Sequence, residues 1–141
     1  MLYNVANKEF FSIQDKEFFF MLRGIRGAAS VEKNNKDDIG QTARTLVTKM
    51  MSLNGLKADD IGAIIFSSTK DLTASFPTTG LRQLKAFRLV PLFDTIEPDI
   101  EGSLPMCIRV LLLVDTDEEP QKICHVYLGE AQKLRPDLAN Q

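Results

Sequence analysis

The sequence predicts an α+β fold in which a mixed five-stranded sheet carries one long and one short helix. Five apolar stretches have the length of strands, one longer stretch repeats apolar residues at helical spacing, and a proline marks a second helix. These elements intermix without a strict β-α-β alternation, which favours a mixed sheet with both helices on one face. A length of 141 residues corresponds to one domain.

The expected strands are short apolar stretches bounded by turn residues. Residues 106–115 are the most apolar run and predict the central strand. Pro91 predicts an edge position or a bulge for its own strand, and the paired glycines of the first strand predict a close backbone approach or a bulge. We expect the five strands over residues 21–28, 61–67, 88–94, 106–115 and 124–128.

The clearest helix covers residues 35–53, where Asn34 or Asn35 can cap the first turn and Asn54-Gly55 ends the last. Its apolar stripe consists of Ile39, Ala43, Leu46, Val47 and Met50. Because proline is tolerated in a first helical turn, we expect the short helix from about Pro77 to Ala86.

The second face of the sheet predicts self-association. Two helices cannot easily cover both faces of a five-stranded sheet, so the other apolar face must be buried against another surface. In a domain of this size a second copy of the same chain is the natural candidate, and we expect a homo-oligomer.

Residues 1–20 differ from the rest of the chain, since they contain five of its nine phenylalanines. Their apolar runs are too short and too interrupted by charge for a signal peptide. We interpret 1–20 as a leader that comes from an upstream start site, 21–134 as the functional domain and 135–141 as an irregular tail.

Charge and composition exclude several classes of partner. With 17 Lys and Arg against 19 Asp and Glu, the chain lacks the basic footprint that nucleic acids or anionic membranes require. No run approaches the roughly 20 apolar residues of a membrane span. Cys107, Cys124 and the single histidine, His125, form neither a disulfide framework nor a metal-ligand cluster. We expect a cytoplasmic protein without a cofactor or a metal.

Arg109 is the strongest anomaly, because it lies within an almost entirely aliphatic strand. An unpaired charge there would cost several kcal/mol, so it must meet a carboxylate, an anion or water. The sequence leaves two interpretations open: an edge-strand arginine paired with an acid such as Glu97 or Asp115, or an arginine that binds an anionic ligand. His125, by contrast, alternates within an apolar strand and predicts a core or interface histidine.

Five segments stand in a specific order and spacing between residues 21 and 138. They are Met21–Ala28 (MLRGIRGA), Phe76-Pro77, Cys107–Val110 (CIRV), His125–Leu128 (HVYL) and Leu134–Leu138 (LRPDL). Together they resemble the monofunctional chorismate mutases of the trimeric, pseudo-α/β-barrel class, as distinct from the all-helical class. The resemblance implies conversion of chorismate to prephenate, and a homotrimer with active sites between subunits.

The resemblance also implies roles for individual residues. Arg109 is expected to face the ether oxygen of the breaking C–O bond, and Glu97 to hold the substrate hydroxyl and orient arginines. Arg26 and Tyr127 are expected to bind the side-chain carboxylate of the substrate. The implied reaction is a unimolecular rearrangement, so it needs no nucleophile, no proton transfer and no cofactor, only positioning and fixed positive charge.

Four further positions complete the expected site. Phe76 and Arg82 are expected to come from the neighbouring subunit, and Arg135 to help close the site. Asp94 and Thr79 depart from the family pattern, which has a cysteine and a lysine there, and the loss of positive charge predicts weaker substrate binding with unchanged chemistry.

Two other functions remain open from the sequence. A non-catalytic trimeric module could bind a carboxylated metabolite as a regulator, and assay of prephenate formation discriminates it from the enzyme. An imine-hydrolysing enzyme of similar trimeric shape is the other alternative, although no motif of this chain supports it.

Overall fold

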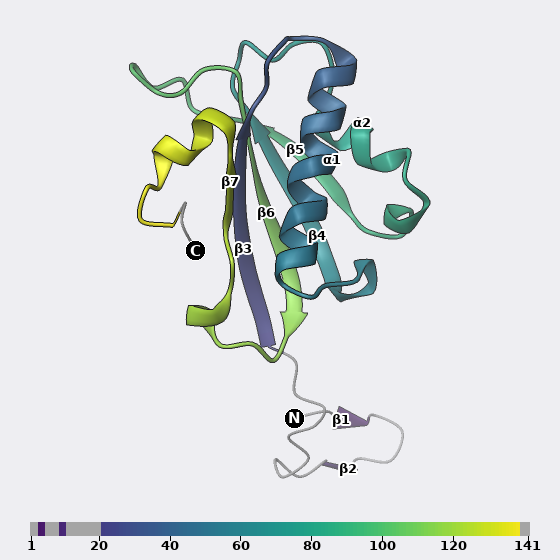
Figure 1. The fold of residues 1–141 in the computed structure, drawn as a ribbon. Coiled ribbons are helices and arrows are strands. Elements are labelled where there is room, and N and C mark those ends of the chain that lie inside the picture. The colour runs from purple at the N-terminus through teal and green to yellow at the C-terminus, as the bar shows by residue number, and fades with distance from the viewer. Residues whose placement is uncertain (1–2, 5–8, 11–20, 139–141) are drawn as a thin grey trace.

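The computed structural model describes residues 3–4, 9–10 and 21–138, and its main body is a mixed five-stranded sheet with two helices (Figure 1). The strands follow the order β5-β4-β6-β3-β7 across the sheet. Their bounds are β3 Met21–Ser30, β4 Ile61–Ser68, β5 Leu92–Ile96, β6 Cys107–Thr116 and β7 Val126–Leu128. A separate short pair joins β1 (Tyr3–Asn4) and β2 (Glu9–Phe10). The expected α+β class and five-stranded mixed sheet are confirmed.

Strand β6 occupies the centre of the sheet, as its apolar sequence predicted. It pairs antiparallel with β3 on one side and with β4 on the other. The edge strands β7 and β5 pair parallel with β3 and β4. Arg109 therefore lies on the central strand, which corrects the interpretation that placed it on an edge strand.

Helix α1 (Lys36–Leu53) lies across one face of the sheet and buries its apolar stripe there (Figure 1). Asn35 caps the helix by accepting a 2.7 Å hydrogen bond from the backbone N–H of Asp38. Gly55, at φ 62°, follows the helix end. A Cβ on Gly27 would lie 2.4 Å from the sulfur of Met50, so this glycine lets β3 approach the helix closely.

Helix α2 (Pro77–Arg82) begins at the expected proline but ends earlier than Ala86. A separate 3-10 turn covers Lys85–Phe87, and β5 starts at Leu92 rather than at residue 88. Pro91 explains the late start, because it has no N–H to donate to a neighbouring strand. The last strand is also shorter than expected, since it starts at Val126 instead of residue 124.

The face of the sheet opposite α1 is the one that positions the site. Side chains on β3, β4 and β6 alternate between the buried helix side and this second, more exposed side. A 3-10 turn (Gly129–Leu134) follows β7 and covers part of the second face. None of the described helices is long and apolar enough to cross a membrane. The expected leader lies mostly outside the described residues.

Candidate functional site

A pocket of about 460 Å³ opens on the second face of the sheet, over β3, β6 and β7. We call it the arginine pocket, because Arg26, Arg109 and Arg135 line it together with Tyr127. Three separate elements supply these arginines: β3, β6 and the end of the Gly129–Leu134 turn. The structure thus brings together four expected site residues that are up to 109 positions apart in the chain.

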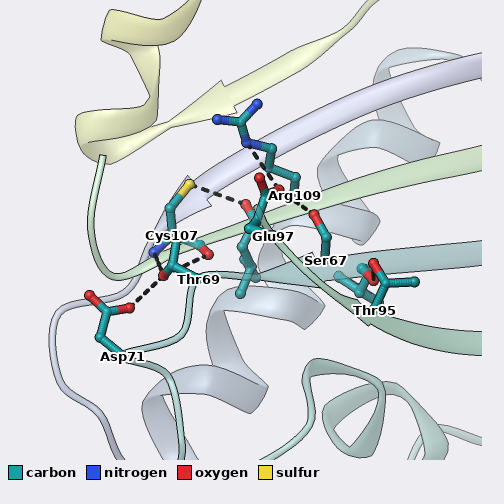
Figure 2. A network of polar contacts seen from close by, with 9 residues as sticks. Ser67, Thr69, Asp71, Thr95, Glu97, Cys107 and Arg109 are labelled. Atoms are coloured by element: carbon teal, nitrogen blue, oxygen red, sulfur yellow. Dashed lines mark hydrogen bonds and ion pairs between the residues drawn. The ribbon is translucent and has the colours of Figure 1, made fainter. Parts of the chain in front are cut away.

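Arg109 is fixed by an ion pair at the centre of the sheet (Figure 2). Its Nε lies 3.2 Å from Oε1 of Glu97, whose side chain is 15% exposed, whereas that of Arg109 is 47% exposed. Figure 2 shows the outer end of the guanidinium pointing away from Glu97. One nitrogen therefore orients the arginine, and the outer nitrogens are directed elsewhere, which joins both interpretations of this residue.

Ser67 is the third member of this group. Its hydroxyl donates to the same Glu97 oxygen that meets Arg109, and Ser67 itself lines the arginine pocket. Ser67 lies beside Arg109 in the β4–β6 register, which is why both reach Glu97. Sequence reasoning missed Ser67, and the available signal was a hydroxyl at the end of a buried strand.

Arg26 is held through its backbone. Its N–H donates a 2.9 Å hydrogen bond to Nδ1 of His125, just before β7 begins to pair with β3. This bond needs a neutral imidazole at Nδ1. Burial, and then the charges of Arg26 and Arg135, hold the pKa of His125 below its ordinary value. His125 is half-buried and has a structural partner, in keeping with its prediction.

Arg135 enters the arginine pocket with a partner of its own. Its Nε and Nη2 donate to the two carboxylate oxygens of Asp137 at 3.0 and 2.8 Å. Both side chains are exposed enough for an incoming anion to compete for the guanidinium. Hydrogen bonding to Arg135 keeps the pKa of Asp137 below its usual range.

A second pocket of about 880 Å³ lies beside β5 and the start of α2. We call it the Phe76 pocket; Phe76, Thr79 and Asp94 line it, and Phe76 is 65% exposed. Thr95 lines both pockets. Arg82 is exposed at the end of α2 and lines neither. The expected site residues thus divide between two pockets of one chain.

The side chain of Asp94 already has donors within its own chain. It accepts hydrogen bonds from the Thr78 hydroxyl at 2.5 Å and from the Thr78 backbone N–H at 3.3 Å. Asp94 pairs with Phe66, whose side chain is buried on the helix side, whereas Thr95 pairs with Ser67 on the arginine side. Asp94 and Glu97 therefore belong to different pockets.

A polar network holds the start of β6 (Figure 2). Asp71 accepts hydrogen bonds from Thr69 and from the backbone N–H of Met106, a residue with the unusual φ of 49°. Burial pushes the pKa of Asp71 upward, but these hydrogen bonds outweigh it, and the pKa lies below its ordinary value. Thr69 also accepts from the N–H of Cys107, two residues before Arg109. The network anchors the strand that carries the central arginine.

The donor set favours an anionic organic ligand over a metal. Arginines bind carboxylates with paired hydrogen bonds and stay charged at any physiological pH. Among residues 21–138 and the described part of the amino end, no group of three His, Cys, Asp or Glu side chains could hold a metal ion.

Comparison with known proteins gives the family. The chorismate mutase type I family model matches residues 22–138. The chain is 46% identical over 119 residues to chorismate mutase AroH of Thermus thermophilus, covering 84% of this chain and 97% of that protein. It is 40% identical to chorismate mutase AroH of Bacillus subtilis, with 84% and 94% covered. A chorismate mutase structure from Clostridium thermocellum superposes with a TM-score of 0.76 and 41% identity, covering 79% of this chain and 98% of that one. The chain belongs to the chorismate mutase type I family.

Proposed function

We propose that this protein isomerises chorismate to prephenate and that the arginine pocket holds the reacting bonds. The family membership supports the reaction, and the Arg109–Glu97 pair is the single observation that carries the assignment of the site. The rearrangement breaks the ether C–O bond and forms a C–C bond within one molecule. No external atom, proton or electron enters or leaves.

Arg109 acts on the breaking bond. Negative charge grows on the ether oxygen in the transition state, so a fixed guanidinium beside that oxygen stabilises the transition state more than the ground state. Glu97 and Ser67 keep the guanidinium aimed before the substrate arrives, which avoids a reorganisation during the reaction. The Glu97 carboxylate also offers an acceptor to the substrate hydroxyl.

Arg26, Tyr127 and Arg135 bind the carboxylates. Chorismate is a flexible dianion, and only its compact conformer can react. Cations on β3 and on the Gly129–Leu134 turn approach that conformer from two directions and restrict it. The substrate carboxylate replaces Asp137 as the partner of Arg135.

The complete site is formed between copies of the chain in a homotrimer. The second face of the sheet supports this arrangement, since Leu22 and Phe93 are 65% and 62% exposed there and Leu111 and Leu113 are half-buried. Such an apolar face is suited to a partner copy. The division of site residues between two pockets also fits it: Phe76, Thr79, Arg82 and Asp94 of one copy complete the arginine pocket of the next.

A cytoplasmic location is consistent with this assignment. Cys107 and Cys124 are both free thiols, as expected in a reducing compartment. Burial raises the pKa of the Cys107 thiol, so this cysteine is an unreactive packing residue.

The purified protein tests the proposal directly. Chorismate absorbs ultraviolet light that prephenate does not, and prephenate is identified separately by chromatography. We expect loss of absorbance with prephenate as the stoichiometric product and no requirement for added metal or cofactor. Binding of chorismate without conversion would support the regulatory module instead.

A further inference from the structure

Thr78, in the first turn of α2, is a buried polar residue with a specific partner. Its side chain is 0% exposed, and it is the polar residue found fully buried among those that the structure describes. A buried hydroxyl without a partner is costly, and Thr78 meets this requirement by donating to Asp94 at 2.5 Å. Its backbone N–H donates to the other carboxylate oxygen at 3.3 Å. Both oxygens of Asp94 are therefore held by one residue.

Asp94 places a negative charge in the wall of the Phe76 pocket. It is half-buried in the edge strand β5 and lines that pocket with Phe76 and Thr79. Lys70 also lines the pocket, but its ammonium is paired with Asp99 at 2.6 Å. An anionic substrate that enters this region would be repelled by a carboxylate free to turn toward it.

Helix α2 is pinned on its other side and cannot follow Asp94 if the carboxylate moves. A Cβ on Gly80 would lie 2.5 Å from the carbonyl oxygen of Gly40, which shows how closely α2 meets α1. Arg44 adds a 3.3 Å hydrogen bond from Nη1 to the carbonyl oxygen of Gly80. The Thr78 donors are thus presented to Asp94 from a fixed helix.

We propose that Thr78 is a positioning residue that holds the Asp94 carboxylate against α2 and so allows this pocket wall to receive a dianionic substrate. The proposal rests on the proposed function, in which the Phe76 pocket completes the site of a neighbouring copy. Hydrogen bonds to a carboxylate are roughly twice as strong as neutral ones, so the pair keeps the charge turned toward its donors. Thr78 acts only through Asp94, and its contribution disappears when residue 94 carries no charge.

A double-mutant cycle with Thr78→Val and Asp94→Asn tests this dependence. Valine keeps the shape of threonine and removes the hydroxyl, which leaves Asp94 with the longer N–H bond alone. We expect Thr78→Val to raise KM about fivefold with kcat nearly unchanged. Asp94→Asn should leave KM within about twofold of wild type, and adding Thr78→Val to it should cause no further rise, because no charge remains to be held.

Two controls separate this role from a merely structural one. Thr78→Ser keeps the hydroxyl and should keep the KM of the wild-type protein. Added salt should reduce the KM rise of Thr78→Val, since charge repulsion is screened. An equal KM rise from Thr78→Val in both backgrounds would overturn the proposal.

The remaining outcomes also decide the proposal. If Thr78→Val does not fold, Thr78→Ala enters the same cycle, and loss of folded protein in both variants irrespective of residue 94 makes Thr78 purely structural. Absence of prephenate formation by the wild-type protein would contradict the proposed function. The positioning role is rejected separately, when the wild-type protein is active and the cycle shows no coupling.

Discussion

The two pockets of this chain differ in how they present charge. In the arginine pocket three guanidinium groups meet, and the central one stands on the middle strand of the sheet. In the Phe76 pocket the aromatic ring is exposed, and the nearby carboxylate of Asp94 is bound by Thr78. One pocket concentrates positive charge, whereas the other supplies an apolar wall and binds its negative charge internally.

This difference indicates a division of labour. Stabilising charge that develops on one oxygen requires a donor held rigidly, and β6 is paired on both sides. Closing a site over a substrate requires shape and the exclusion of repulsion, which an edge strand and a short helix can supply. Substitutions in the arginine pocket should therefore change kcat, and substitutions in the Phe76 pocket should change KM.

Arg109→Lys should give the largest effect and breaks the comparison if it does not. Lysine keeps the charge but cannot bind Glu97 through one nitrogen while directing others at the ether oxygen. We expect kcat to fall about 10²- to 10³-fold with an unchanged Tm. Steady-state kinetics and thermal unfolding measure the two quantities.

Arg23→Lys is the matched control for this variant. Arg23 lies on β3 outside both pockets, and its guanidinium contacts backbone atoms at the far end of the strand. Near wild-type turnover by Arg109→Lys would contradict the assignment of the reacting bond to this pocket.

Ser67→Ala should have an intermediate effect and sharpens the role of the Glu97 group. The variant removes one hydrogen bond to a carboxylate that orients Arg109, a loss of about 1.5 kcal/mol, or roughly tenfold. We expect this loss in kcat rather than in KM. Ser52→Ala, on the exposed side of α1, serves as the control, and a change confined to KM would argue that Ser67 binds substrate instead of positioning Glu97.

Substitutions of the Arg135–Asp137 pair should have the smallest effects, and on KM. Asp137 competes with a substrate carboxylate for Arg135, so Asp137→Asn should lower KM about twofold. Arg135→Ala should raise KM several-fold and leave kcat nearly unchanged. A higher KM for Asp137→Asn would indicate that Asp137 positions Arg135 instead of competing for it.

Local sequence patterns were sufficient to predict most of the fold. The apolar run of β6 predicted its central position, and Asn35 and Gly55 predicted the ends of α1. The start of β5 was wrong, because the effect of Pro91 on pairing depends on which strand lies beside it. Apolar residues 88–90 fit a turn as well as a strand, and only tertiary packing decides between them.

The site was predictable residue by residue but not in its geometry. Arg109 stood out because a charge in an aliphatic strand needs a partner, and Glu97 was one of two acids considered. Ser67 was missed since a serine at a strand end has no distinctive pattern, and its role depends on the β4–β6 register. The bond from Thr78 to Asp94 joins residues 16 positions apart on different elements, a proximity that no local periodicity encodes.

Mixing two inactive variants tests the central claim, that one copy supplies the arginine pocket and another the Phe76 pocket. Arg109→Lys disables the first, and Phe76→Asp disables the second by placing a charge at an exposed position that the core does not need. Random co-assembly of equal amounts should restore about a quarter of the wild-type activity, because each trimeric site combines pockets from two independent chains. Activity no higher than the average of the two separate variants would contradict a site shared between copies.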